Sequence, residues 1–135
     1  MLRVDAIESS YGTSQVLFGM SLEVNAGEVV TLMGRNGMGK TTTIRSIMGL
    51  MQPHGGAAYF EDQKISGRPS HEIAKLGIGL VPEGRQIFPN LTVRENLIAT
   101  AHNMAGNPDP WTLDKVLKRF PSLEARISGM GNELS

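Results

Sequence analysis

One glycine-rich loop, set between a strand-like run and a helix-like run, constrains this chain more than any other feature. Residues 34–41 read Gly-Arg-Asn-Gly-Met-Gly-Lys-Thr, which fits the phosphate-binding pattern G-x-x-x-x-G-K-[ST]. The apolar run Val29–Met33 predicts a buried strand, and Thr41–Leu50 predicts a helix. The apolar face of that helix would carry Ile44, Ile47 and Met48. Strand, loop and helix in this order are the context that the motif needs, which disfavours a glycine-rich turn that merely precedes a lysine.

The residue types of the loop suit a nucleoside triphosphate with Mg²⁺. The glycines allow a tight turn and let backbone N–H groups approach phosphate oxygens, and the positive end of the next helix faces the same anion. Lys40 can reach the β- and γ-phosphates, and the Thr41 hydroxyl is placed to ligate Mg²⁺. The expected nucleotide-binding residues here are Gly34, Arg35, Asn36, Gly37, Met38, Gly39, Lys40, Thr41 and Thr42.

Composition narrows the function classes. The chain has 135 residues, enough for one domain with a core, and its 13 basic and 13 acidic residues cancel. Without a basic field, a role on DNA or RNA is disfavoured. The absence of cysteine excludes disulfides and cysteine-ligated metals, and the three histidines have no metal-ligand spacing. No signal core or run of membrane-spanning length is present, so we expect any work at a membrane to go through a partner.

The residues before the loop predict antiparallel strands. Apolar residues alternate with polar ones from Leu2 to Ala6, Ile7 interrupts the phase, and Tyr11–Gly12 marks a turn. Residues 16–24 predict further strand, which ends at the turn 25–27.

Two apolar runs follow the loop. Ala57–Phe60 ends at Glu61–Asp62 and predicts an ordinary strand with a polar turn; the alternative, an acidic strand end that holds magnesium water, is disfavoured because the run follows the first helix too closely. Ile78–Val81 predicts a second buried strand that ends in a polar loop, residues 82–86, at the edge where open α/β sheets bind ligands.

One helix is predicted between these two apolar runs, and others are predicted after the second run. Ser70 is a plausible N-cap for a short helix that ends at Gly77. Thr92–Glu95 is a capping box, and helical spacing follows at Val93, Leu97, Ala101 and Met104. A further amphipathic helix would start with Asp109 as N-cap and Pro110 at its first position, with Pro121 as its limit. Its apolar face would carry Leu113, Val116, Leu117 and Phe120. For Trp111 a packing role is favoured over a ligand contact.

From these motifs the chain resembles the ATP-binding subunit of ABC transporters, in particular the branched-chain amino-acid importer type. The resemblance rests on three segments in order: Tyr11–Gly12 with Val16–Leu17, then GRNGMGKTTTIRSIMGL, then GIGLVPEGRQIFPNLTVRENL. It implies an α/β fold, with an incomplete P-loop NTPase-type core, an amino-terminal antiparallel β part and a helical subdomain. Residues 1–83 would form the β part and phosphate-loop core, and residues 84–135 the glutamine-loop region and helical subdomain.

The resemblance also implies roles for single residues. Tyr11 would stack on adenine, with Val16 beside the base; read from the residues alone, a turn aromatic that covers the sheet edge is equally plausible for Tyr11. Glu83 stands where most of these ATPases carry a glutamine that touches magnesium or its water, and its negative charge would be offset by Mg²⁺ and Arg85. The implied metal ligands are Thr41 and Glu83, and the implied cofactors are ATP and Mg²⁺.

The end of the sequence departs from the family pattern. Leu134–Ser135 matches only the start of the family's signature sequence, and no later acidic strand end, catalytic glutamate or switch histidine follows. We therefore expect the amino-terminal portion of a longer protein, with no catalytic residue of its own.

Three functions remain open. The leading hypothesis is an energy-coupling ATPase subunit on the cytoplasmic face of the cell membrane. Its partners would be transmembrane permease subunits, a second identical or related ATP-binding subunit and, indirectly, a periplasmic solute-binding protein; nucleic acid is not among them. The second is a nucleotide-binding fragment without catalysis, and the third is another P-loop enzyme such as a small-molecule kinase. Branched-chain amino acids are the expected solutes, with urea or amides as the alternative.

Overall fold

The chain forms two compact units, Met1–Leu80 and Val81–Ser135. This computed structural model describes residues 1–84, 86–103 and 106–134. The sequence placed a boundary three residues later, after residue 83, and the assignment of 1–83 and 84–135 to parts of one domain stays a prediction. Within the described ranges no helix has both the length and the apolar character needed to cross a membrane.

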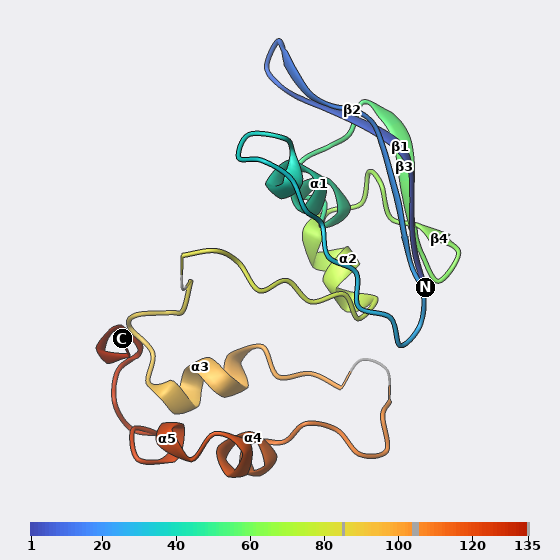
Figure 1. Ribbon diagram of the computed structural model, residues 1–135. Helices are drawn as coiled ribbons and strands as arrows, with labels where there is room; N and C mark the ends of the chain where they lie inside the picture. Colours follow the sequence, from blue (N-terminus) through green and yellow to red (C-terminus); the bar gives the residue numbers. More distant parts are fainter. Residues whose placement is uncertain (85, 104–105, 135) are drawn as a thin grey trace. The chain divides into compact units, whose positions relative to one another are not determined.

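The first unit is built on a 4-stranded antiparallel sheet with the strand order β2-β1-β3-β4 (Figure 1). The strands are β1 (Leu2–Tyr11), β2 (Ser14–Val24), β3 (Gly55–Phe60) and β4 (Gln63–Lys64). The predicted antiparallel beginning of the chain is confirmed. Glu61–Asp62 is a tight turn between β3 and β4, as expected for an ordinary strand with a polar end, and both of its residues have positive φ angles.

A bulge in β1 explains why the apolar phase breaks at Ile7. The pairing of β1 with both neighbours is irregular between Val4 and Glu8, and Ala6 has a φ of 44°. As a result both Val4 and Ile7 point into the core, although they are an odd number of residues apart. Gly56 lies against the bulge: a Cβ there would stand 2.2 Å from the Ala6 carbonyl oxygen, so no other residue fits without backbone movement.

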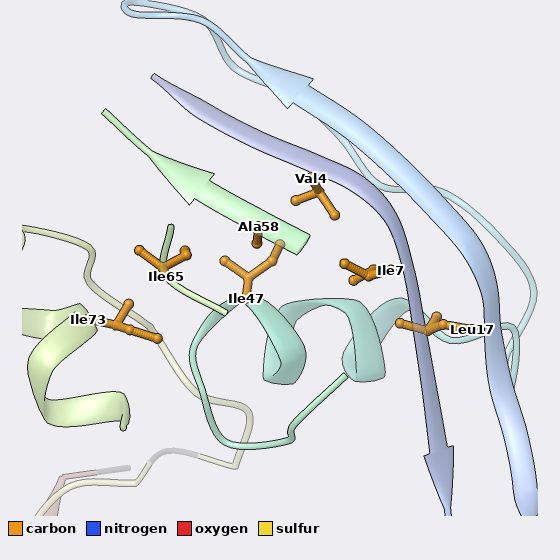
Figure 2. Close-up of a cluster of buried hydrophobic side chains, with 7 residues drawn as sticks. All are labelled: Val4, Ile7, Leu17, Ile47, Ala58, Ile65 and Ile73. Carbon is orange, nitrogen blue, oxygen red and sulfur yellow. The ribbon is translucent and has the colours of Figure 1, made fainter. Parts of the chain in front are cut away.

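Two helices supply the rest of the core of this unit. They are α1 (Lys40–Ile47) and α2 (Ser70–Lys75). Figure 2 shows the core side chains, which come from three strands, both helices and the segment between β4 and α2. They are Val4, Ile7, Leu17, Ile47, Ala58, Ile65 and Ile73. A buried hydrogen bond of 2.9 Å between the hydroxyls of Ser9 and Ser46 also joins β1 to α1.

Two details of these helices differ from the prediction. Ile44 is 40% exposed, so its expected place on the buried face of α1 is wrong. Thr43 and Ser46 occupy that face, with Ile47 and Met48, because small side chains let the helix approach the sheet closely. In α2 the N-cap is Pro69 rather than Ser70, which is already the first helical residue.

The two predicted buried parallel strands are not formed. Residues 29–33 and 78–81 run as irregular chain, and Val29 and Met33 are 93% and 83% exposed. A strand exists only where its N–H and C=O groups are paired with a neighbour. The described part of the sheet is antiparallel throughout and offers neither segment a partner.

The second unit consists of short helices. They are α3 (Val93–Ala99), α4 (Leu113–Arg119), α5 (Pro121–Glu124) and the 3₁₀ turn η1 (Gly131–Glu133). The predicted capping box is confirmed: the Glu95 N–H donates to the Thr92 hydroxyl at 3.2 Å, and the Thr92 N–H donates to the Glu95 carboxylate at 2.8 Å. The helix does not continue to Ala101, and Met104, Arg85 and Ser135 lie outside the described residues.

The predicted start of the next helix is wrong. Its N-cap is Thr112, whose hydroxyl accepts a hydrogen bond from the Lys115 N–H, and not Asp109. Asp109 lies before the helix, and its carboxylate instead forms an ion pair with the amino group of Lys115. The face predicted to be apolar is only partly covered, and Phe120 is exposed. Trp111 is 70% exposed, so the packing role expected for it is wrong as well.

Asn96 organises the segment that precedes α3. Its side-chain oxygen accepts a hydrogen bond from the Phe88 N–H at 2.8 Å, and its side-chain nitrogen donates to the Phe88 carbonyl at 3.0 Å. The same nitrogen lies within 3.2 Å of two further carbonyls, those of Leu91 and Thr92. The side-chain amide therefore pairs with the loop backbone as a neighbouring strand would.

Candidate phosphate-binding loop and base site

The phosphate loop is an exposed turn whose shape depends on glycine. Gly37 and Gly39 have φ angles of 82° and 87°, in the left-handed region that side chains disfavour. Inside the turn the Met38 N–H donates to the Arg35 carbonyl at 3.3 Å. Gly34, Arg35, Asn36, Gly37 and Met38 are all exposed, which leaves this stretch accessible to a ligand.

The end of the loop is fixed against strand β2. Gly39 is buried, and a Cβ at its position would stand 2.6 Å from Leu17 Cδ2 and 3.4 Å from Val16 Cγ1. The Gly39 carbonyl accepts two hydrogen bonds from Thr43, one from the N–H at 2.8 Å and one from the hydroxyl at 3.0 Å. The hydrogen bonds fix the first turn of α1, and the close approach of Gly39 to Leu17 and Val16 places that turn against strand β2.

The Lys40 ammonium group is positioned over the loop. It donates to the carbonyls of Gly34 and Arg35, at 2.7 and 2.9 Å. Lys40, the first residue of α1, therefore places its positive charge beside the start of the loop. Of the two threonines that follow, Thr41 is exposed and Thr42 is buried. Ammonium, hydroxyl and backbone donors at one helix N-terminus are the chemistry that a phosphate group requires, so the loop fits ATP and Mg²⁺ as predicted partners.

Tyr11 lies at the last position of β1, beside the hairpin turn and near the end of the hairpin that carries Leu17. It is 46% exposed, and its hydroxyl accepts a hydrogen bond from Arg45 Nη1 at 3.4 Å. Hydrogen bonds from the Thr42 hydroxyl and the Arg45 guanidinium lower the pKa of Tyr11 below its ordinary value. Val16, the second residue expected beside a base, is half-buried on β2. Both residues therefore belong to the hairpin on which the loop is anchored.

Glu83 lies in the second unit, in the exposed loop before Phe88. Thr41, the other predicted metal ligand, lies in the first unit. Among the described residues no cluster of three or more histidine, aspartate or glutamate side chains could hold a metal ion by itself. A shared role of Thr41 and Glu83 toward Mg²⁺ stays a prediction.

The contacts of Arg45 and Asn96 were not predicted from the sequence. Arg45 follows Thr42 by three positions on α1, and this spacing alone would have placed both side chains on one face. Asn96 sits inside a helical apolar pattern, where an amide side chain carries no recognisable motif. Its hydrogen bonds to residues 88–92 depend on how the chain turns back before α3.

The loop, its helix and the hairpin beneath it define the class of protein: an incomplete α/β core of the P-loop nucleotide-binding type. Comparison with known proteins gives the family. Residues 17–135 match the pattern of the ABC transporter family, and the chain belongs to that family.

Two relatives illustrate the match. The high-affinity branched-chain amino acid transport ATP-binding protein BraG of Pseudomonas aeruginosa is 38% identical over 135 residues, which is 100% of this chain and 58% of BraG. The lipopolysaccharide export system ATP-binding protein LptB of Haemophilus influenzae is 40% identical over 99 residues, 73% of this chain and 41% of LptB. The chain thus spans little more than half the length of BraG.

A solved structure agrees with these sequence relatives. The ADP conformation of MJ1267, an ATP-binding cassette of an ABC transporter, is 29% identical and matches with a TM-score of 0.68. The match covers 100% of this chain and 59% of that cassette. The predicted fold class and the predicted family are therefore confirmed.

Proposed function

We propose that this chain is the nucleotide-binding part of an ATP-binding, energy-coupling subunit of an ABC importer for branched-chain amino acids. The loop of residues 34–41 is the observation that carries the proposal. Two of its glycines have left-handed backbones, and the start of α1 packs against strand β2. The Lys40 ammonium group lies beside the carbonyls at the start of the loop. This arrangement presents positive charge and donors to a polyphosphate.

The choice of solute rests on the extent of similarity. BraG, named for branched-chain amino acid transport, aligns with the whole chain, whereas LptB, named for lipopolysaccharide export, aligns with 99 residues at similar identity. An export role is therefore the competing proposal, and an importer for urea or amides is a variant of the favoured one. Solute specificity would reside in the partner subunits, because the loop would contact only the nucleotide.

The proposal extends to partners and place. The subunit would lie on the inner face of the cell membrane, bind transmembrane permease subunits and pair with a second ATP-binding subunit. A periplasmic solute-binding protein would act through the permease. The Thr41 hydroxyl and Glu83 would serve Mg²⁺, and the Tyr11 ring with Val16 would contact adenine.

Binding of ATP by the loop is tested with a single charge removal. Lys40→Ala deletes the ammonium group that faces the phosphates, so the affinity for Mg-ATP should fall at least tenfold, about 1.4 kcal/mol or more. Isothermal titration calorimetry measures this directly. Lys64→Ala, which removes an exposed lysine of β4, is the matched control and should bind ATP as the wild type does. Equal affinity of the wild type and the Lys40→Ala variant would refute the assignment.

The base site is tested by comparing two ligands. Tyr11→Ala should weaken Mg-ATP, because base stacking on one aromatic ring contributes about 1–3 kcal/mol. Inorganic tripolyphosphate has no base, so its affinity should change little. Should both ligands weaken by the same factor, Tyr11 is a structural residue and the base site lies elsewhere.

Coupling to a solute requires the whole assembly. The full-length protein, reconstituted with its permease subunits in vesicles, should hydrolyse ATP faster when a branched-chain amino acid and its binding protein are present. If only urea or an amide stimulated hydrolysis, that compound would be the proposed solute instead of a branched-chain amino acid. Stimulation by lipopolysaccharide would favour the export proposal. Residues 1–135 by themselves should bind ATP without turnover, because the family's acidic strand end and catalytic glutamate are not among these residues.

A further inference from the structure

The hydroxyl of Tyr11 accepts a hydrogen bond from Arg45 of helix α1. We propose that Arg45 is a positioning residue of the base site: it holds the Tyr11 hydroxyl and fixes the ring in its binding orientation before a nucleotide arrives. The inference rests on the proposed function, because it deepens the role of the same site.

The geometry places a donor from helix α1 on the Tyr11 hydroxyl oxygen. Arg45 Nη1 lies 3.4 Å from that oxygen. Thr42 and Arg45 are three residues apart, so they share a face of α1. Thr42 is buried, whereas Arg45 is exposed.

This contact matters because Tyr11 would otherwise be free to turn. It ends β1 next to Gly12, whose φ of 58° opens the hairpin turn, and almost half of the residue's surface is exposed to solvent. Ordering such a side chain on ligand binding costs conformational entropy. A ring already held by α1 avoids this cost for a ligand with a base, and a ligand without a base gains nothing.

The same contact links the two halves of the nucleotide site. Lys40 starts α1 and lies over the phosphate loop, and Arg45 is one and a half turns further along the same helix. The distance between the ring and the loop is then set by a single rigid element. Arg45 would therefore favour ligands that join a base and a polyphosphate at the spacing of a nucleoside triphosphate.

The lowered pKa of Tyr11 agrees with this geometry. Donors on the hydroxyl oxygen stabilise the tyrosinate form, and the first cause is the Thr42 hydroxyl, followed by the Arg45 guanidinium. Removal of Arg45 should raise the pKa of Tyr11 toward its ordinary value. The chain has only two tyrosines, Tyr11 and Tyr59. In a Tyr59→Phe background, the absorbance of tyrosinate therefore reports on Tyr11 alone.

The test uses Tyr11→Phe, Arg45→Met and the double variant, each with Mg-ATP and with inorganic tripolyphosphate. Tyr11→Phe keeps the ring and removes the hydroxyl. We expect each single variant to weaken ATP about three- to tenfold, as the loss of preorganisation predicts, and the double variant to be no weaker than the singles. Tripolyphosphate should bind all of them equally. Tyr59→Phe and Arg94→Met, an exposed arginine on α3, are the matched controls and should bind both ligands as the wild type does.

Two results would overturn the inference. One is wild-type ATP affinity in both Tyr11→Phe and Arg45→Met. The other is an equal loss of ATP and tripolyphosphate binding in Arg45→Met without a rise in the pKa of Tyr11, which would mean that Arg45 acts on helix stability. If Tyr11→Ala selectively weakens ATP while Tyr11→Phe does not, the base site stands and only the role of Arg45 fails.

Discussion

The two left-handed glycines of the phosphate loop differ in their surroundings, and this difference can be measured residue by residue. A Cβ at Gly37 would meet nothing within 4 Å, whereas one at Gly39 would overlap Leu17 Cδ2 at 2.6 Å. Gly37→Ala should lower the free energy of unfolding by about 1–2 kcal/mol, from backbone strain alone. Gly39→Ala should lose about 1–3 kcal/mol more, from overpacking.

Urea denaturation of the two variants gives this comparison. Leu17→Ala should destabilise the Gly39→Ala variant less than it destabilises the wild type, because in that background it also removes the overlapping methyl group. Equal destabilisation by Gly37→Ala and Gly39→Ala would show that Gly39 does not pack against β2 in solution.

For single residues, the sequence predicted which residues form the phosphate loop better than it predicted which side chains lie around them. The motif located Gly34 to Thr42 because the pattern G-x-x-x-x-G-K-[ST] is local and depends on few residues. It could not predict that Gly39 lies on Leu17, or that the Tyr11 hydroxyl lies near Arg45, 34 positions away. Such contacts depend on how the hairpin and α1 pack, which no local pattern contains.

Among the elements, helix α3 depends on a capping box whose carboxylate titrates. The Thr92 N–H, and then the Thr92 hydroxyl, lower the pKa of Glu95 below its ordinary value of 4.5. Since the folded pKa is the lower one, the stabilisation is complete above the unfolded value and is lost as the pH falls through the folded value. The protection factors of the α3 amides, which correct for the intrinsic exchange rate at each pH, should therefore fall as the pH drops below about 4.5.

Two variants test the capping box. Glu95→Gln should exchange faster than the wild type at neutral pH and show less dependence on acid, because its amide does not titrate. Thr92→Ala should destabilise α3 by about 1 kcal/mol at all pH values through loss of the N-cap. An acid response of the Glu95→Gln variant as large as that of the wild type would assign the titration to another group.

The elements also show where prediction from sequence stops. Capping boxes and turns are local, and the hairpin turns and the start of α3 were predicted correctly. Val29–Met33 and Ile78–Val81 were predicted as strands from apolar, β-branched composition, yet a strand needs a partner at hydrogen-bonding distance. The composition of these two runs therefore predicted that they need to be buried, but it could not predict which strand they would pair with.

For the whole molecule, the exposed run Val29–Met33 predicts self-association. Val29 and Met33 present unpaired backbone and apolar side chains to solvent, a combination that promotes strand pairing between copies. Residues 1–135 should therefore form concentration-dependent oligomers in sedimentation velocity experiments. The double variant Val29→Lys with Met33→Lys should shift the distribution toward monomer.

Phe18→Lys is the control for that experiment, because it adds charge at another exposed apolar position, on strand β2. It should leave the oligomers in place. A monomeric wild type would contradict the prediction, and an equal shift by Phe18→Lys would move the association to the sheet edge at β2.

The central position of β1 has a consequence for synthesis on the ribosome. The first strand to emerge pairs on one side with β2, its immediate successor, and on the other with β3, which begins only at Gly55. The β1–β2 hairpin can form within microseconds of its release, since its turn is two residues long. Its core face must then wait for α1 and β3, so Val4 and Ile7 are exposed to chaperones until some thirty further residues have left the exit tunnel.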